Sequence, residues 1–262
     1  MVVGNSGDCR DYLFSKDSQL LAVTSKDGNV RVWDLPQREI KYQFKCPGAP
    51  SPVAFRSGGR ELVVADRDGG ALHEWNLTTG KETRYWRKPK AGSHWYGGFA
   101  FSPDDRWHLS VDSAGTVLLH DLIANRTTNA DLLMGHIDHV AFSPDSRLFA
   151  TLSDNLGFNL NLWETDNLRP LGRMETGGHS LSFSPDGERL AIGSGGKDAV
   201  SIWDVAGARQ LLSLEGESRL VWWCEFSPDG NVIGALNGLG VLRLWRAPSW
   251  AEIEAAEKAG TW

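Results

Sequence analysis

The segment FSPDGERLAIGSGGKDAVSIWDV, residues 183–205, contains the structural unit that decides the fold of this chain. Its first residues predict a tight turn, because Pro185 fixes φ at a value that turns use and Gly187 provides a permissive backbone position. Residues 189–194 predict a short apolar strand, and a second turn signal follows at residues 195–198. Short strands and turns therefore alternate through the segment.

Residues 199–205 alternate with a period of two, which is the pattern of a β-strand with two different faces. Val200 and Ile202 lie on one face of this strand, and Ser201 and Trp203 lie on the other. One apolar strand precedes the first turn, and a more polar strand follows the alternating one. The sequence therefore predicts a unit of four short antiparallel strands.

The same unit occurs six times, with copies 41 to 46 residues apart. The phenylalanines that mark the copies are Phe14, Phe55, Phe101, Phe142, Phe183 and Phe226. A fixed period in this range is typical of one supersecondary unit stacked many times. A single four-stranded sheet cannot bury both of its faces, whereas radial stacking gives it a neighbour on each side. The predicted fold class is all-β: a β-propeller of about six four-stranded antiparallel blades, with a short C-terminal helix.

A tryptophan follows five of the six phenylalanines by about twenty residues, and His120 takes its place in the third copy. An aromatic ring buries on the order of 150–250 Å², so one tryptophan per blade is predicted to be core rather than a ligand site. The structural repeat residues predicted in this way are Trp33, Asp34, Trp75, Trp163, Trp203, Asp204 and Trp245.

The order Phe-Ser-Pro-Asp-Gly, then Ser-x-Asp-Gly-x-Val-x-x-Trp-Asp, resembles the repeat of the WD-repeat β-propeller family. Residues 14–35 and 183–205 match this pattern closely, and the resemblance covers residues 9–247. The Phe-Ser-Pro-Asp-Gly spelling resembles that of bacterial members. The resemblance implies a non-catalytic scaffold that presents propeller rim loops to a peptide or protein partner.

The chain is predicted to consist of the propeller, residues 1–247, and a helical tail, residues 248–262. Ser249 and Glu252 form the pattern of a helix capping box, so the last blade is expected to lack a fourth strand of its own. Either residues 1–3 supply that strand, or the chain is the C-terminal module of a larger protein with a domain upstream. We favour the larger protein, because an open ring would expose a long strand edge.

The composition excludes several classes of function. The net charge is −6 and the isoelectric point is about 5.6, so nucleic-acid binding is not expected. Three scattered cysteines fit neither a disulfide framework nor a zinc site, and no cofactor motif is present. The N-terminus does not resemble a signal peptide, and no apolar run approaches the ~20 residues of a membrane helix. We therefore expect a cytoplasmic protein without membrane contact.

No catalytic motif is evident, so the chain is predicted not to be an enzyme. The sequence contains no nucleophile elbow and no glycine-rich loop between a strand and a helix. The alternative is a six-bladed propeller hydrolase, lactonase-like or glycosidase-like, with a site at the mouth of the channel. Function depends on sites rather than folds, and no such site can be assigned from the residues.

Two segments are candidate protein-binding sites, because tyrosine, tryptophan and arginine anchor many interfaces. The first is a basic and aromatic cluster in the longest gap between repeats: Arg84, Trp86, Arg87, Lys88, Trp95 and Tyr96. The alternative interpretation of this cluster is an exposed outer strand whose charges are solvated and bind no partner. The second is Arg219, Trp222 and Trp223, in which one of the two adjacent tryptophans is expected to be core and the other to lie near the channel or rim.

Overall fold

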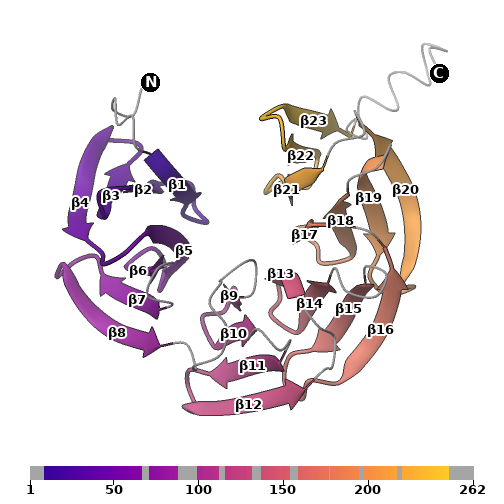
Figure 1. Cartoon of the computed structure of the whole chain (residues 1–262), viewed down its shortest axis with the longest axis horizontal. Helices are drawn as coiled ribbons and strands as arrows, with labels where there is room; N and C mark the ends of the chain where they lie inside the picture. Colours follow the sequence, from indigo (N-terminus) through magenta and orange to yellow (C-terminus); the bar gives the residue numbers. More distant parts are fainter. Residues whose placement is uncertain are drawn as a thin grey trace. The chain divides into compact units, whose positions relative to one another are not determined.

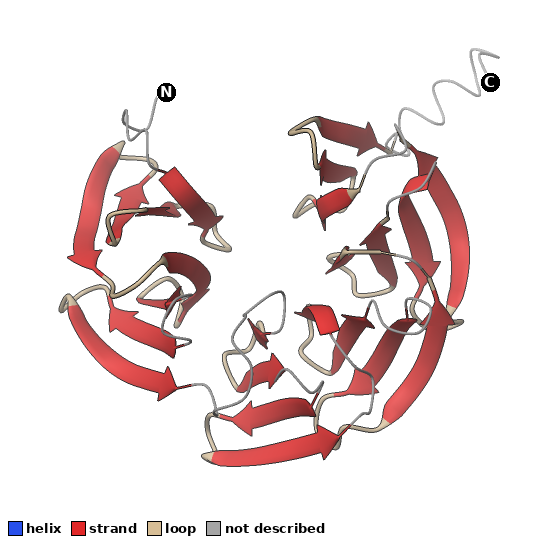
Figure 2. Cartoon of the chain, in the orientation of Figure 1, coloured by secondary structure: helices blue, strands red, loops and turns tan. Residues whose placement is uncertain are grey.

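The computed structural model of the chain describes residues 9–66, 71–87, 99–111, 116–131, 137–153, 159–176, 178–194, 198–216 and 220–247. These residues form β-strands and turns, and none of them is helical (Figure 2). A search of this described part for a helix able to cross a membrane finds none. The helix expected from Ser249 and the strand expected at residues 1–3 lie outside the described residues.

The chain divides into two compact units, of which the first is Met1–Trp95. It contains two four-stranded antiparallel sheets, each with its strands in sequence order (Figure 1). Sheet 1 consists of β1 (Cys9–Phe14), β2 (Leu20–Ser25), β3 (Asn29–Asp34) and β4 (Glu39–Lys45). Sheet 2 consists of β5 (Pro50–Arg56), β6 (Glu61–Asp66), β7 (Ala71–Asn76) and β8 (Lys81–Arg87).

The second unit, Tyr96–Trp262, contains four more antiparallel sheets. Sheet 3 consists of β9 (Phe99–Phe101), β10 (Trp107–Val111), β11 (Thr116–Asp121) and β12 (Arg126–Asp131). Sheet 4 consists of β13 (Ile137–Phe142), β14 (Leu148–Ser153), β15 (Asn159–Glu164) and β16 (Pro170–Glu175). Sheet 5 consists of β17 (Ser180–Phe183), β18 (Arg189–Gly193), β19 (Asp198–Asp204) and β20 (Arg209–Glu215). Sheet 6 consists of β21 (Val221–Phe226), β22 (Val232–Asn237) and β23 (Leu242–Arg246).

Six consecutive antiparallel sheets confirm the all-β class with six propeller blades. Five sheets have four strands, and sheet 6 has three within the described residues. The expectation that the last blade lacks its own fourth strand stays a prediction, because residues 248–262 lie outside the described residues. The division into one propeller, residues 1–247, and a tail, residues 248–262, stays a prediction.

Neighbouring sheets within a unit pack in one repeated way. We call the face of a sheet that packs on the following sheet its forward face, and the opposite face its backward face. Between sheets 4 and 5, Leu160 and Leu162 on a forward face share a core with Phe183, Ile192 and Trp203 on a backward face. Cores of the same kind join sheets 1 and 2, sheets 3 and 4, and sheets 5 and 6. A mostly aliphatic forward face therefore meets an aromatic backward face each time.

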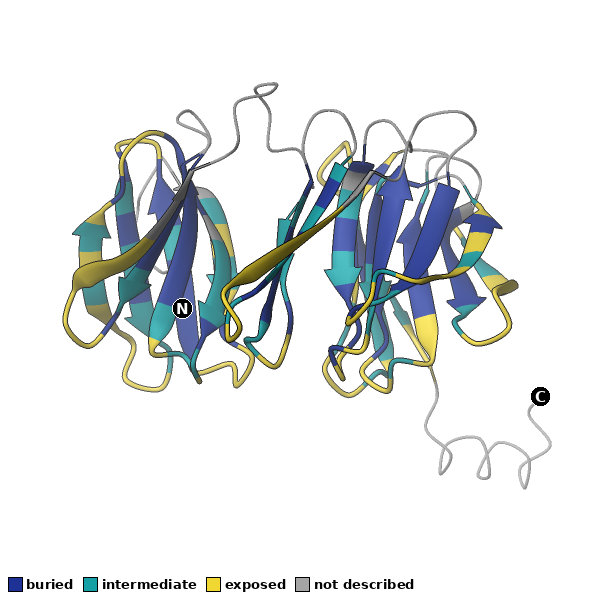
Figure 3. Ribbon diagram, turned by 90° about the horizontal axis from the view of Figure 1, so that it is seen from below, coloured by how far each residue is buried: buried dark blue, intermediate teal, exposed yellow. Residues whose placement is uncertain are grey.

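Burial follows the position of a strand within its sheet (Figure 3). The second strands β2, β6 and β14 are almost entirely buried. The fourth strands β4, β16 and β20 are mostly exposed. This gradient explains why the fourth strand of a repeat is the most polar, since it contacts solvent along most of its length.

The repeat tryptophans lie at the ends of the third strands. Trp163 Nε1 donates a hydrogen bond of 3.1 Å to Thr151, and Trp203 Nε1 donates one of 2.9 Å to Ser201. The ring of Trp75 stacks on Phe44 of the preceding sheet, with centroids 4.4 Å apart. Trp163 and Trp75 thus join neighbouring strands or neighbouring blades, whereas the Trp203 bond lies within β19.

The aspartate after Trp33, His120 or Trp203 organises the turn to the fourth strand of its sheet. Asp34 accepts the backbone N–H of Gln37 at 3.1 Å, and Asp204 accepts that of Gly207 at 2.7 Å. In the third repeat Asp121 accepts two backbone N–H groups of the same turn, at 3.0 and 2.9 Å. Short acidic side chains satisfy turn amides in this way, so the aspartate has a local structural role.

The serine of Phe-Ser-Pro-Asp is the centre of the first turn in five of the six repeats. Its hydroxyl donates to the aspartate two residues later and accepts the backbone N–H five residues later. The five pairs are Ser15–Asp17, Ser102–Asp104, Ser143–Asp145, Ser184–Asp186 and Ser227–Asp229. Hydrogen bonding from Ser143 lowers the pKa of Asp145, which keeps this turn carboxylate ionised. The motif is therefore a hydrogen-bonded turn.

The second repeat departs from this pattern, because Arg56 replaces the serine. Arg56 is buried, and its Nη1 donates to the carboxylate of Glu74, which is almost completely buried on β7. The Nε of Arg84 lies 3.7 Å from the other Glu74 oxygen. Sheet 2 therefore has a buried arginine–glutamate ion pair, and the other sheets have the serine–aspartate turn.

The position four residues after each phenylalanine adopts a left-handed backbone in all six repeats. The residues at this position are Ser18, Gly59, Asp105, Ser146, Gly187 and Gly230, with φ between 57° and 81°. Gly187, expected from the sequence to occupy the permissive position of its turn, has φ of 75°. Three repeats use a residue with a side chain at this position.

We expect Ser18→Gly to increase the free energy of unfolding by about 0.5–1 kcal/mol. A left-handed conformation costs a residue with a side chain about 1–2 kcal/mol, and the entropy cost of glycine offsets part of the gain. The turn bond from Ser18 N to Ser15 O, at 2.8 Å, uses only backbone atoms and is retained. Urea denaturation of the variant and the parent measures the difference. Gly187→Ser is the matched control and should have the opposite sign; a less stable Ser18→Gly variant would contradict the prediction.

Candidate protein-binding site

Trp222 is directed out of sheet 6 by a β-bulge. The pairing of β21 with β22 runs from Val221↔Asn237 to Trp223↔Leu236, so the register shifts at Trp222. An extra residue in one strand bends the strand and redirects a side chain. The Trp222 side chain is 58% exposed, which is unusual for a tryptophan in the first strand of a blade.

The hairpin between β22 and β23 supports the Trp222 ring. A Cβ atom at Gly238 would lie 2.8 Å from Trp222 Nε1, so a larger residue there would require the indole to shift. Gly238 N donates to the carbonyl of Leu220 at 2.9 Å, which connects the hairpin to the segment before β21. The His179 ring lies 5.8 Å from the Trp222 ring. Leu220 and Leu239 are both exposed on this rim.

We call Leu220, Trp222, Leu239 and His179 the Trp222 patch. Exposed apolar side chains rimmed by polar groups mark interaction surfaces, and tryptophan is enriched among the residues that anchor interfaces. The patch offers a fixed aromatic ring, two leucines and an imidazole. This chemistry can hold an apolar side chain of a partner, but it provides no nucleophile.

Trp223 does not belong to the patch. It pairs with Leu236 in the regular ladder and lies on the forward face of sheet 6, where it is 43% exposed. The expectation that one of the two tryptophans is core stays a prediction. The bulge redirects Trp222 away from the regular ladder in which Trp223 lies.

The basic and aromatic cluster is described only in part. The side chain of Arg84 is half exposed and lies beside Glu74. The backbone of Trp86 and Arg87 belongs to β8, and the side chains of these two residues lie outside the described part. The other predicted residues of both segments that fall outside the described ranges are Lys88, Trp95, Tyr96 and Arg219. The cluster stays a prediction.

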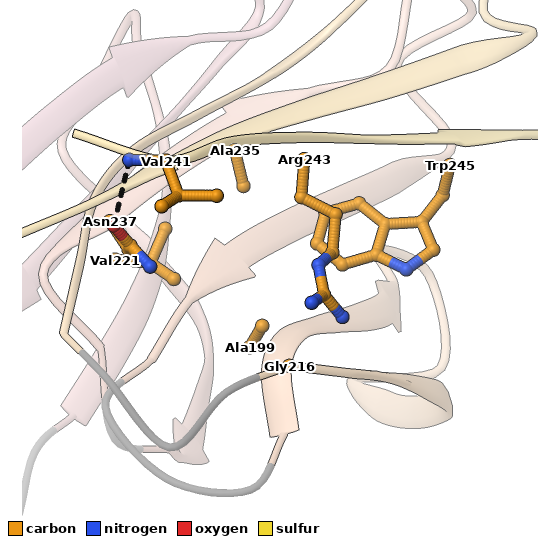
Figure 4. Close-up of a pocket in the computed structure, with 8 residues that line it drawn as sticks. All are labelled: Ala199, Gly216, Val221, Ala235, Asn237, Val241, Arg243 and Trp245. Carbon is orange, nitrogen blue, oxygen red and sulfur yellow. Dashed lines mark hydrogen bonds between the residues drawn. The ribbon is translucent and has the colours of Figure 1, made fainter. Parts of the chain in front are cut away.

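A small pocket lies at one side of sheet 6 (Figure 4). Its empty volume is about 310 Å³ and it is open to solvent. Ala199, Val221 and Ala235 provide apolar walls, and Arg243 and Trp245 line the same pocket. Val241 N donates to Asn237 at one end, at 3.0 Å. No carboxylate lines it, so it lacks the paired acids that glycoside hydrolysis uses.

The ionisable groups in the described ranges do not suggest a reactive centre. No group of three histidine, cysteine or acidic side chains suited to a metal ion occurs there. Cys46 and Cys224 are buried thiols. Burial raises the pKa of Cys46 to about 12 and that of Cys224 to about 11, so both stay protonated and unreactive at neutral pH.

Sequence reasoning identified Trp222 and missed its neighbours. Leu239 stands between Gly238 and Gly240 in a tight hairpin, and an apolar residue in such a turn is a signal of surface exposure. The contribution of His179 could not be recognised in the same way, because it comes from the preceding repeat.

Comparison with known proteins supports the repeat assignment. The family model "WD domain, G-beta repeat" matches residues 2–34. Periodic tryptophan protein 2 of Arabidopsis thaliana is 25% identical over 81% of this chain and 24% of its own length. Target of rapamycin complex subunit LST8 of Mus musculus is 26% identical over 59% of this chain and 49% of its own length. Transcriptional corepressor LEUNIG_HOMOLOG of Arabidopsis thaliana is 21% identical over 90% of this chain and 29% of its own length.

The chain thus spans less than half of the length of each of these relatives. The three relatives come from eukaryotes, so the resemblance to bacterial repeats stays a prediction. The matched family and the six blade-type sheets agree with each other. They indicate that residues 2–34 resemble a WD40 repeat, in line with the repeated sheets.

Proposed function

We propose that this chain, a protein of the WD40 repeat family, is a non-catalytic scaffold that binds a peptide or protein segment on one rim of its blades. The observation that carries the proposal is Trp222, which a β-bulge and Gly238 hold in an exposed position. A rigid aromatic side chain on a fixed element loses little entropy on binding. The partner would insert an apolar side chain between Trp222 and Leu239.

The relatives support a role in assembly. One of them is named as a subunit of a complex, and another as a transcriptional corepressor. By analogy, the partner of this chain is another protein rather than a small substrate. The identity of that partner is not part of the proposal.

The wording of the repeat motif supports two more specific parts of the proposal. The protein is bacterial, and the chain is the C-terminal module of a longer protein. A cytoplasmic location belongs to the same proposal. A hydrolase of the lactonase or glycosidase type is the alternative function, and no observation in the described residues favours it.

The test is the affinity of the Trp222→Ala variant for a partner isolated with the parent protein. Removing an interface anchor costs about 2 kcal/mol or more, which corresponds to roughly a 30-fold increase in Kd. The fold should be unchanged, because the ring is exposed. Leu171→Ala, in the exposed strand β16, is the matched control and should bind like the parent. Equal affinity of parent and Trp222→Ala would refute the role of the patch.

A further inference from the structure

The pocket in Figure 4 lies between sheets 5 and 6, and every residue that lines it belongs to the second unit. Ala199 and Gly216 line it from the side of sheet 5, and Ala235 and Arg243 line it from sheet 6. Sheets 5 and 6 share a core to which Ala199 and Ala235 both belong. The shape of this pocket therefore follows from the packing of two neighbouring sheets within one unit.

Small side chains on both sheets leave the space of the pocket open. Nine residues after the repeat phenylalanine, sheet 2 has Val64, sheet 5 has Ile192 and sheet 6 has Ala235. Val64 and Ile192 are fully buried in the cores that their sheets share with the preceding sheets. Ala235 has a shorter side chain and fills less of the equivalent space. On the facing side, a Cβ atom at Gly216 would lie 2.3 Å from Cβ of Ala199, so this wall is also kept low.

Of the described residues that line the pocket, only Arg243 is charged. Two residues before its repeat tryptophan, sheet 5 has the neutral Ser201 and sheet 6 has Arg243. Arg243 Nη1 donates to the carbonyl oxygen of Glu215 at 3.2 Å, which holds the guanidinium beside sheet 5. A guanidinium has five N–H donors and can donate to more than one acceptor at once. The pocket therefore suits a side chain with an aliphatic stem and a terminal carboxylate.

The pocket and the Trp222 patch share the hairpin between β22 and β23. The side-chain oxygen of Asn237 accepts the backbone N–H groups of Leu239 and Val241, both at 3.0 Å. Asn237 and Val241 line the pocket, whereas Leu239 belongs to the patch. Val221, which also lines the pocket, directly precedes Trp222 in β21. One bound segment can therefore reach both places.

We infer that the pocket binds a glutamate side chain of the partner segment whose apolar side chain lies on the Trp222 patch, so this assignment rests on the proposed function. The methylene groups of the glutamate pack against Ala235 and the indole of Trp245. Its carboxylate accepts hydrogen bonds from the guanidinium of Arg243, which pairs opposite charges in a partly apolar site. The partner is thus a segment with one large apolar residue and one glutamate.

The experiment is a selection from an immobilised library of random heptapeptides, carried out with the parent chain, Arg243→Gln and Trp222→Ala. The parent is expected to enrich peptides that carry a large apolar residue and a glutamate at a constant spacing. Arg243→Gln should keep the apolar preference and lose the preference for glutamate. Trp222→Ala should lose the apolar preference and keep the preference for glutamate, so the two places are tested separately.

One enriched peptide then gives the size of the effect. Replacing its glutamate with glutamine should raise the Kd for the parent about fivefold, which is the factor expected for a partly exposed ion pair. The same replacement should leave the Kd for Arg243→Gln unchanged. Ala235→Ile introduces the residue that sheet 5 has at this position, so it should fill the pocket and remove the preference for glutamate although Arg243 is retained. Ala235→Ile also gives the readout if circular dichroism shows that Arg243→Gln is not folded.

Three results would overturn the assignment of the pocket. A parent chain that enriches apolar residues without glutamate would leave the Trp222 patch in place and exclude the pocket as a binding site. A preference for glutamate that persists in both Arg243→Gln and Ala235→Ile would mean that another cation holds the carboxylate. A parent chain that enriches no sequence would refute the pocket and the proposed function together.

Discussion

Replacing Phe149 with alanine is expected to lower the free energy of unfolding by about 3–5 kcal/mol, which is the usual cost of removing a buried phenylalanine. Phe149 is fully buried on β14. Its ring centroid lies 6.2 Å from Trp163 and 5.9 Å from Phe142. All three residues belong to the core between sheets 3 and 4.

The large effect follows from the way in which blades pack. Each blade is stabilised mainly by its two neighbours, so a cavity in one interface weakens the attachment of a whole sheet. Urea denaturation of the parent and of Phe149→Ala measures the loss. Ile123→Ala, at an exposed position, should change stability by less than about 0.5 kcal/mol. A loss below about 1 kcal/mol for Phe149→Ala would contradict the proposed packing.

Replacing Arg56 with alanine is expected to cost about 3–5 kcal/mol at neutral pH, because it leaves a buried carboxylate without its main partner. Glu74 is almost completely buried, and Arg56 donates directly to it. Arg84 is half exposed and 3.7 Å away, so it cannot replace Arg56 fully. The stability lost in Arg56→Ala includes the cost of leaving Glu74 unpaired. It therefore does not equal the net contribution of the ion pair to the stability of the parent protein.

The effect of Arg56→Ala should depend on pH. Burial raises the pKa of Glu74, and the charge of Arg56 opposes this increase. A carboxyl group with a raised folded pKa stabilises the fold below its unfolded pKa, and this contribution disappears as pH rises through the folded pKa. Without Arg56 the folded pKa rises further, so Glu74 takes up a proton more readily in the variant. The destabilisation should therefore be larger at about pH 8 than at about pH 5.

Urea denaturation at both pH values tests this prediction. The double variant Arg56→Met with Glu74→Leu should recover most of the stability, since neither buried charge is then present. A loss for Arg56→Ala that is the same at both pH values would indicate that Glu74 stays charged or is solvated. In that case the ion pair with Glu74 would not be the reason why Arg56 replaces the turn serine in the second repeat.

The local features of the fold could be predicted from the sequence because they depend on neighbouring residues. The alternation around Trp203 gave the two faces of β19 correctly. Gly187 was expected to occupy the permissive position of its turn, and it has a positive φ. The turn after Phe183 and the strand boundaries that follow it also agree with the structure. Six repetitions of these signals were sufficient to predict six blades.

The candidate site could be predicted only in part. Trp222 was recognised from its residue type, but the bulge that exposes it depends on how β21 pairs with a strand ten or more residues away. Gly238 and His179 reach the ring from other parts of the chain. Whether Trp223 is core stays a prediction, because the burial of a face depends on a neighbouring sheet, which no local pattern encodes.

The sequence by itself determined the strands, the turns and the number of blades, since each of these depends on hydrogen bonds and dihedral preferences within a few residues. Only the tertiary structure decided which faces are covered. It brings Arg56 to Glu74, eighteen residues away, and it buries Val30 and Val32 under sheet 2. A face is buried only when a second sheet packs on it. The local sequence of a strand gives the composition of its own face but does not say which other sheet covers it.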